Sequence, residues 1–337
     1  MGRSDPMLAP PSRRRTAAIR ITAALAVALA FALGVYMLLE FTRPNGGLIS
    51  FSFLIILPGA ISAFVAYVAD PWGERSRGAY LLVPVWLSLA AIVASAVFLR
   101  EGVICIVMLA PLWLLSGMAG AALTYSFRRR RPEVDIDAFY SAALLALPVI
   151  ALQVEPFIPL PETSRTVSRS VVVHAPPQAI WPLLRGVPDI RPGEGRWNLT
   201  QDVIGIPRPV GARLVGDGLG ADRHAVWSHG IRFRERIVYW EPNERIGWRF
   251  IFDDVAAWAF TDRHLTPNSS YFRVTTGGYA VEVLPGGVSR VTLTTRYWMR
   301  TPVNAYCALW GELFLGDLEN SLLAVIRQRA EGRPAAR

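Results

Sequence analysis

Residues 170–184 read SVVVHAPPQAIWPLL, and this stretch decides the fold of the C-terminal half of the chain. Its run of β-branched valines is typical of a strand and stops at His174. Pro176 and Pro177 suit the first turn of a helix, which needs no backbone N–H donors. The residues behind them form a short apolar stripe at helical spacing: Ile180, Leu183 and Leu184, with Trp181 beside them. A strand that passes directly into an amphipathic helix therefore opens a folded domain.

Further strand-like segments and one long helix follow this junction. Turn residues separate the strand-like segments, which are 222–228, 232–240, 245–252, 271–275, 279–284 and 288–299. The final helix is predicted over 303–331, because apolar residues recur three or four positions apart at Trp310, Phe314, Leu318, Leu322 and Val325. The predicted order is a strand, helices, five or six antiparallel strands and a long terminal helix. This is an α+β domain.

The N-terminal half has the composition of a membrane protein. Hydrophobic residues make up 52% of the chain and charged residues 18%, and the apolar residues concentrate before residue 155. Four apolar runs are long enough to cross a bilayer: 21–39, 48–68, 80–99 and 103–125. A fifth run, 138–154, is at the short limit, so a bundle of four or of five transmembrane helices is expected. Small residues four apart, such as Gly59 and Ala63, predict close packing between these helices.

The charges indicate an orientation rather than a nucleic-acid partner. The net charge of +9 comes from arginine alone, and in the C-terminal half both signs are interspersed, so nucleic acid is not expected to bind. Eleven of the 13 arginines before residue 160 fall on one side of the predicted spans, which is therefore the cytoplasmic side, together with the N-terminus. Five spans would place the C-terminal domain on the opposite side, and four would keep it in the cytoplasm.

The order of these elements resembles the helix-grip fold of the START-like superfamily of polyketide cyclases and lipid-transport proteins (SRPBCC), and more closely its bacterial membrane-anchored members. The matching residues are Ala175-Pro176-Pro177, Ile180-Trp181, Leu184, Gly220–Arg223, Trp227-Ser228, Gly230, Phe233, Glu235, Ile237, Trp240–Pro242, Thr295, Tyr297, Pro302, Tyr306 and Ala330-Glu331. The resemblance implies a curved antiparallel sheet wrapped on a long C-terminal helix. It also implies a hydrophobic ligand between the two, and a place in a bacterial inner (plasma) membrane.

The predicted organisation has five parts. They are a basic cytoplasmic segment (1–20), a transmembrane domain (21–154), a proline-rich linker (155–164), a START-like domain (165–331) and a short tail (332–337).

Strand alternation predicts which side chains face the concave side of the sheet. In 231–239 three arginines share one face, so the other face, which includes Glu235, must point inward. Arg223 on the neighbouring strand shares the parity of inward residues and could meet Glu235. Two hypotheses remain open, because such a pair could fix the head group of a ligand or could simply join two strands.

The inward residues and the apolar face of the last helix make up the candidate ligand-binding set. Its members are Arg223, Trp227, Phe233, Glu235, Ile237, Tyr239, Trp248, Phe250, Tyr279, Thr295, Tyr297, Trp310 and Phe314. The sequence carries no metal-binding or nucleotide-binding motif, so no metal ion or cofactor is expected.

These features favour a membrane-anchored domain that binds a lipid or another hydrophobic small molecule, with a role in lipid handling or transport. Two alternatives remain. One is a cyclase-like or aromatase-like enzyme that uses Glu235 as acid or base, and the other is a structural or sensory module whose core is filled by its own side chains. Binding is favoured over catalysis.

Overall fold

The computed structural model describes residues 13–43, 46–70, 73–95, 97, 102–130, 138–260 and 264–332. The chain divides into two compact units, of which the first holds residues 1–99 and 109–159 and the second holds residues 100–108 and 160–337. The first twelve residues of the predicted basic segment and the tail after residue 332 lie outside the described residues.

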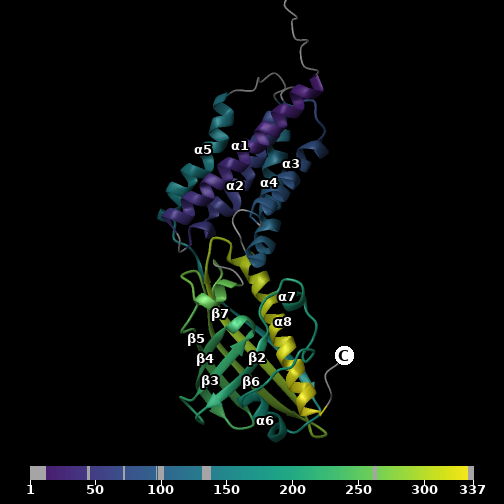
Figure 1. The fold of residues 1–337 in the computed structure, drawn as a ribbon, viewed down its shortest axis with the longest axis vertical. Coiled ribbons are helices and arrows are strands. Elements are labelled where there is room, and N and C mark those ends of the chain that lie inside the picture. The colour runs from purple at the N-terminus through teal and green to yellow at the C-terminus, as the bar shows by residue number, and fades with distance from the viewer. Residues whose placement is uncertain are drawn as a thin grey trace, which may run out of the picture. The chain divides into compact units, whose positions relative to one another are not determined.

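The first unit is helical, and five described helical segments are long and apolar enough to cross a membrane (Figure 1). The helices are α1 (Arg13–Thr42), α2 (Leu57–Ala69), α3 (Arg77–Ala94), α4 (Val103–Arg130) and α5 (Ala138–Val154). A π-helical turn, Ser52–Ile56, lengthens α2 at its start. The apolar run at the short limit is thus helical and continues to Phe157, and the length and composition of the described helices favour five spans over four.

Small residues bring α2 and α4 into backbone contact, as their spacing predicts. A Cβ atom on Gly120 would lie 2.1 Å from the carbonyl oxygen of Gly59, so only glycine fits at this point. The hydroxyl of Ser116, one turn earlier on α4, donates a hydrogen bond to the carbonyl of Ile55. Close approach with a polar bridge is the usual way in which helices associate without a hydrophobic driving force.

We expect Gly120→Ala to destabilise the helical unit by about 1–3 kcal/mol, because α2 and α4 must separate to admit the methyl group. The matched control is Gly34→Ala on α1, where an added Cβ meets nothing within 4 Å. Thermal unfolding of the two variants in the same detergent, followed by circular dichroism, measures the difference. Equal midpoints for both variants would contradict the contact.

A buried polar cluster closes one end of the helical unit. Asp70 is 3% exposed, and its carboxylate accepts hydrogen bonds from the Tyr80 hydroxyl (2.9 Å) and from the backbone N–H of Arg75 (3.0 Å). Arg128 donates to the carbonyl oxygen of Asp70 over 2.6 Å and covers the ring of Tyr67 at 4.7 Å. These contacts join α2, α3 and α4 at the loop that follows α2.

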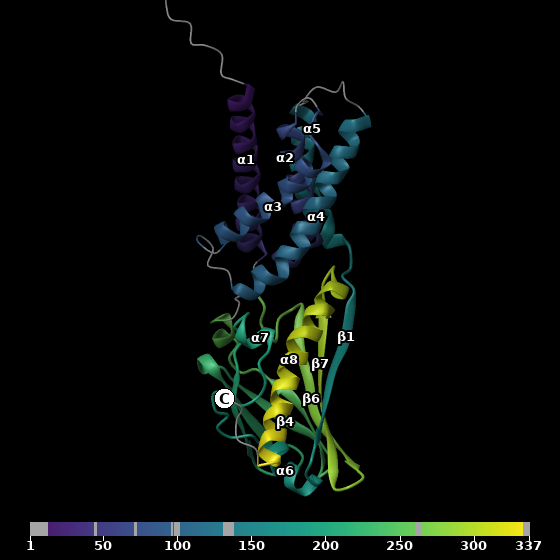
Figure 2. The ribbon, with the colours of Figure 1, turned by 90° about the vertical axis from the view of Figure 1, so that its right-hand side faces the viewer.

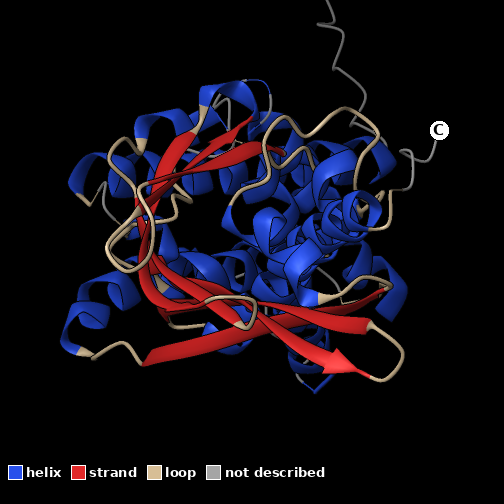
Figure 3. Ribbon diagram, turned by 90° about the horizontal axis from the view of Figure 1, so that it is seen from below, coloured by secondary structure: helices blue, strands red, loops and turns tan. Residues whose placement is uncertain are grey.

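In its described residues, the second unit contains one antiparallel sheet of seven strands, three helices of its own and the first turns of α4. The strands are β1 (Glu162–Val173), β2 (Pro209–Val215), β3 (Asp222–Trp227), β4 (Arg232–Glu241), β5 (Arg245–Ile251), β6 (Phe272–Leu284) and β7 (Val288–Arg300), in the order β1-β7-β6-β5-β4-β3-β2. The helices are α6 (Pro177–Arg185), α7 (Leu199–Asp202) and α8 (Asn304–Ala330). The sheet curves, and α8 runs along its β1 and β7 side (Figures 2 and 3). This is the helix-grip fold of START-like domains, as predicted.

Three elements differ from the sequence-based expectation. No sequence pattern predicts an element over 209–215, but strand β2 forms there through antiparallel pairing with β3 and a hydrogen bond from Ala212 N–H to the carbonyl of Val187 (2.8 Å). The short helix α7 is capped by the Asn198 side chain, which accepts from the N–H of Gln201. Strand β6 is continuous through Gly277 and Gly278, which were expected to interrupt it.

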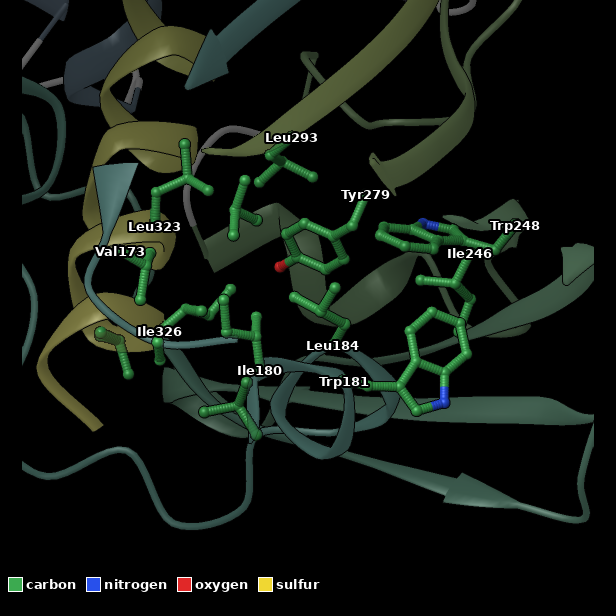
Figure 4. Close-up of a cluster of buried hydrophobic side chains, with 14 of the residues drawn as sticks. Val173, Ile180, Trp181, Leu184, Ile246, Trp248, Tyr279, Leu293, Leu323 and Ile326 are labelled. Carbon is green, nitrogen blue, oxygen red and sulfur yellow. The ribbon is translucent and has the colours of Figure 1, made fainter. Parts of the chain in front are cut away.

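The junction of the quoted stretch lies in the middle of the largest apolar cluster of the domain. Val173 ends β1, and Ile180 and Leu184 face inward from α6 (Figure 4). They pack with sheet residues such as Leu293 and with Leu323 and Ile326 of α8 (Figure 4). The strand-to-helix junction therefore closes one end of the space between the sheet and α8.

Candidate ligand-binding interior

Strand β4 presents its residues to the interior as the alternation predicts, up to one point. Ile231, Phe233, Glu235 and Ile237 are each at most 6% exposed. A β-bulge between Ile237 and Tyr239 then reverses the parity, so Tyr239 is 38% exposed. The expectation that Tyr239 faces the interior is therefore wrong, and Trp240 packs inward against Trp181 instead.

The predicted meeting of Arg223 and Glu235 occurs in the interior. The two residues are directly opposite each other on β3 and β4, and Nε of Arg223 lies 2.5 Å from Oε2 of Glu235. Arg223 also donates to the carbonyl oxygen of Leu184 (3.0 Å), and its guanidinium lies 4.3 Å from the ring centroid of Trp248. The pair thus joins two strands to α6, with both members at most 5% exposed.

Burial dominates the electrostatics of this ion pair. It raises the pKa of Glu235 above its ordinary value, and Arg223 opposes that rise. Burial also disfavours the charged guanidinium, but Glu235 and Tyr279 together outweigh it, so the pKa of Arg223 is raised. The arrangement keeps Arg223 charged and commits its donors to protein groups.

A second set of polar groups in the interior is not fully satisfied by the protein. Glu319 of α8 is 2% exposed, and its carboxylate oxygens make no hydrogen bond of normal geometry with the described residues, although Thr295 on β7 lies close enough to oppose the rise in its pKa. The Tyr279 hydroxyl on β6 and the indole N–H of Trp248 on β5 are likewise buried without a hydrogen bond of normal geometry to the described residues, and the guanidinium of Arg223 lies close enough to Tyr279 to oppose the rise in its pKa. Buried polar groups without such hydrogen bonds are costly, so these atoms are candidate contacts for a bound molecule or for water.

The protonation of Glu319 follows from its surroundings. Burial raises the pKa of its carboxyl to about 7, while Thr295 on β7 and the charge of Arg169 on β1 oppose part of the rise. Glu312, one of the nearby charges on α8, pushes the pKa upward. Glu319 is therefore a carboxylic acid that exchanges its proton near neutral pH.

The absence of a side chain at Gly277 lets Trp248 occupy the interior. A Cβ atom there would lie 2.7 Å from Nε1 of Trp248, so the indole covers the backbone of β6 directly. Gly277 pairs with Trp248 on one side and with Thr295 on the other. A larger residue at Gly277 would therefore displace the indole of Trp248.

An aromatic cluster lies toward β3 and the loop after β5. Its rings contact one another at centroid distances of 5.5–6.1 Å around Phe233, and its members are Trp227, Phe233, Phe250, Phe252 and Trp258. Phe250 also contacts Trp248, so the cluster continues into the polar interior.

The structure does not bring all of the candidate ligand-binding residues together. Arg223, Glu235, Ile237, Trp248, Phe250, Tyr279 and Thr295 line the central interior, and Trp227 and Phe233 belong to the aromatic cluster. Tyr297 packs instead against β1 and the first turns of α8, in a cluster with Val167 and Met299. Trp310 and Phe314 form a further cluster with Ile204 and Ile206.

Sequence reasoning missed Glu319. The expected apolar stripe of α8 ran through Leu318 and Leu322, but the face buried most deeply passes through Gly316, Glu319, Leu323 and Ile326. Apolar residues surround much of this helix, so their spacing alone did not select the inward row. A carboxylate at helical spacing within a row of apolar or small residues was the signal in the sequence.

No three His, Cys, Asp or Glu side chains among the described residues are placed to hold a metal ion.

Comparisons with known proteins find likenesses of structure alone. No family model matches the chain, and no curated protein matches it. A solved aromatase/cyclase, Zhui from Streptomyces sp. R1128, is 15% identical with a TM-score of 0.32, over 50% of this chain and 94% of its own. A norcoclaurine synthase from Thalictrum flavum is 11% identical with a TM-score of 0.31, over 50% of this chain and 98% of its own. The Aha1 dimer from Colwellia psychrerythraea is 15% identical with a TM-score of 0.25, over 48% of this chain and 98% of its own.

Proposed function

We propose that the helix-grip domain binds a lipid or another hydrophobic small molecule in the interior between its sheet and α8. The observation that carries this proposal is the set of buried polar atoms on Trp248, Tyr279 and Glu319 that make no hydrogen bond of normal geometry with the described residues. They lie among apolar side chains and beside the Arg223–Glu235 pair, where a ligand with a large apolar body and a small polar group would satisfy them.

Binding is proposed in preference to catalysis by Glu235. A general acid or base needs a proton that it can exchange with a substrate, whereas the carboxylate of Glu235 is held by Nε of Arg223 over 2.5 Å. The hypothesis of a filled core remains the rival, because apolar side chains fill the end of the interior next to α6 (Figure 4).

The five apolar helical segments support an integral membrane protein, and we place it in a bacterial inner membrane with its N-terminus in the cytoplasm. An odd number of spans then puts the helix-grip domain on the opposite side. Alkaline phosphatase fused after Gly332 would be active in this orientation, while activity of a cytoplasmic reporter at that position would refute it.

The binding proposal is tested by mass spectrometry of organic extracts from the purified full-length chain. We expect a distinct apolar species to co-purify with the natural protein and to be lost from Thr295→Phe, which fills the interior from β7. Thr294→Phe is the matched control, because the adjacent residue points to the other face of the sheet and should retain the species. Equal extracts from all three proteins, or an empty natural protein, would refute the proposal.

A further inference from the structure

The hydroxyl of Tyr279 and the carboxyl of Glu319 are both buried between the sheet and α8, Tyr279 on β6 and Glu319 on the helix. In Figure 4 the Tyr279 hydroxyl points to the side of the interior on which α8 lies. Glu319 lies one turn before Leu323 on the same buried face of that helix, since residues four apart are neighbours on a helix surface. The two groups also interact electrostatically, because the charge of Glu319 raises the pKa of Tyr279.

The hydrogen-bonding capacity of these two groups selects a particular partner. Tyr279 offers a donor, and above pH 7, where the carboxyl of Glu319 is ionised, Glu319 offers acceptors only, so the test below is made at pH 8. A hydroxyl group has one donor and two acceptor lone pairs, so it can accept from Tyr279 and donate to Glu319 simultaneously. An ether can accept but cannot donate, and it would leave Glu319 unpaired.

The charges in the interior disfavour an anionic ligand. Arg223 already pairs with Glu235 and donates to the carbonyl oxygen of Leu184. Arg169, which approaches α8 from β1, pairs with Glu312 over 2.6 Å. A carboxylate or phosphate head group would therefore meet the negative charge of Glu319, while both of these arginines already pair with protein groups.

We propose that Glu319 and Tyr279 bind the hydroxyl group of an uncharged, otherwise apolar ligand. This inference rests on the proposed function and adds the polar chemistry of the ligand to it. The aromatic cluster and the apolar core then surround the apolar body of the ligand. A trapped water molecule is the rival occupant, because it offers the same donors and acceptors.

The test compares 1-dodecanol with its methyl ether, 1-methoxydodecane, on the full-length chain in lipid nanodiscs. Binding is followed by native mass spectrometry, and the ratio of the two dissociation constants is compared between proteins, so that partition of the probes into lipid cancels. The preference for the alcohol over the ether is the ratio of their dissociation constants. This preference should be about tenfold greater in the natural protein than in Tyr279→Phe or Glu319→Leu. Glu319→Gln keeps an acceptor at this position and should retain most of the preference.

The control is Glu312→Leu, whose carboxylate lies on the same helix with its side chain 53% exposed, and it should leave the ratio unchanged. A ratio that is the same in all five proteins, with both probes bound, would overturn the hydroxyl subsite and leave the binding function standing. That result is expected if water satisfies the two groups. Failure of both probes to bind any of the proteins would overturn the binding function and this inference with it.

Discussion

Arg223→Leu is expected to destabilise the helix-grip domain by about 3–5 kcal/mol, the largest effect of any single change considered for this domain. The variant leaves the carboxylate of Glu235 buried at 4% exposure without its cation. It also removes the hydrogen bond to Leu184 and the contact with Trp248. Chemical unfolding of the full-length chain in detergent, followed by tryptophan fluorescence, measures the loss.

The double variant Arg223→Leu, Glu235→Leu should recover most of this loss, because two apolar residues replace two buried charges. The single and double variants together isolate the coupling energy of the pair. Arg236→Leu is the matched control, since Arg236 pairs with Asp222 on the same two strands but its side chain is 43% exposed. It should cost about 1 kcal/mol or less. A loss for Arg223→Leu no greater than that of Arg236→Leu would contradict the role of the buried pair.

Glu319→Gln is expected to stabilise the protein above neutral pH. Burial raises the pKa of Glu319 from an ordinary value of 4.5 to about 7, so between these values the folded state holds a proton that the unfolded state has released. The free energy of unfolding therefore falls as pH rises through this range and becomes level above it. The shift corresponds to a loss on the order of 3 kcal/mol at pH 8, at about 1.4 kcal/mol for each unit of pKa.

The measurement is the free energy of unfolding of the natural protein and of Glu319→Gln at several values between pH 4.5 and pH 8. The difference between the two proteins should grow with pH in favour of the variant. Glu312→Gln removes another carboxylate from the same helix. The side chain of Glu312 is far more exposed than that of Glu319, so this variant should not reproduce the trend. A difference that does not depend on pH would mean that Glu319 titrates at its ordinary value.

Much of the fold could be predicted from the sequence because local patterns and the final packing agree. The prolines after His174 start α6, and the alternation of β4 holds from Ile231 to Ile237. The pattern failed where a long-range interaction decides the structure. The bulge that exposes Tyr239 and the pairing that makes β2 a strand depend on residues elsewhere in the sheet and loops.

The candidate interior was predictable in part for the same reason. The pairing of Arg223 with Glu235 follows from strand parity, which the sequence carries. The position of Glu319 depends on how α8 is rotated against the sheet, and a helix with apolar residues on several sides does not encode that rotation by spacing alone. The separation of Tyr297, Trp310 and Phe314 from the central interior has the same cause.

The pairing of β1 with β7 also determines when the domain can fold during synthesis. Val167 of β1 is opposite Thr295 of β7, so the first strand of the domain pairs along its length with the last one, and β1 has no other neighbour in the sheet. On the ribosome, the backbone groups of β1 stay unpaired until β7 has been made, and α8 follows later still. Contacts of such large sequence separation fold slowly, so the apolar helices of the chain emerge and can insert well before the domain behind them closes.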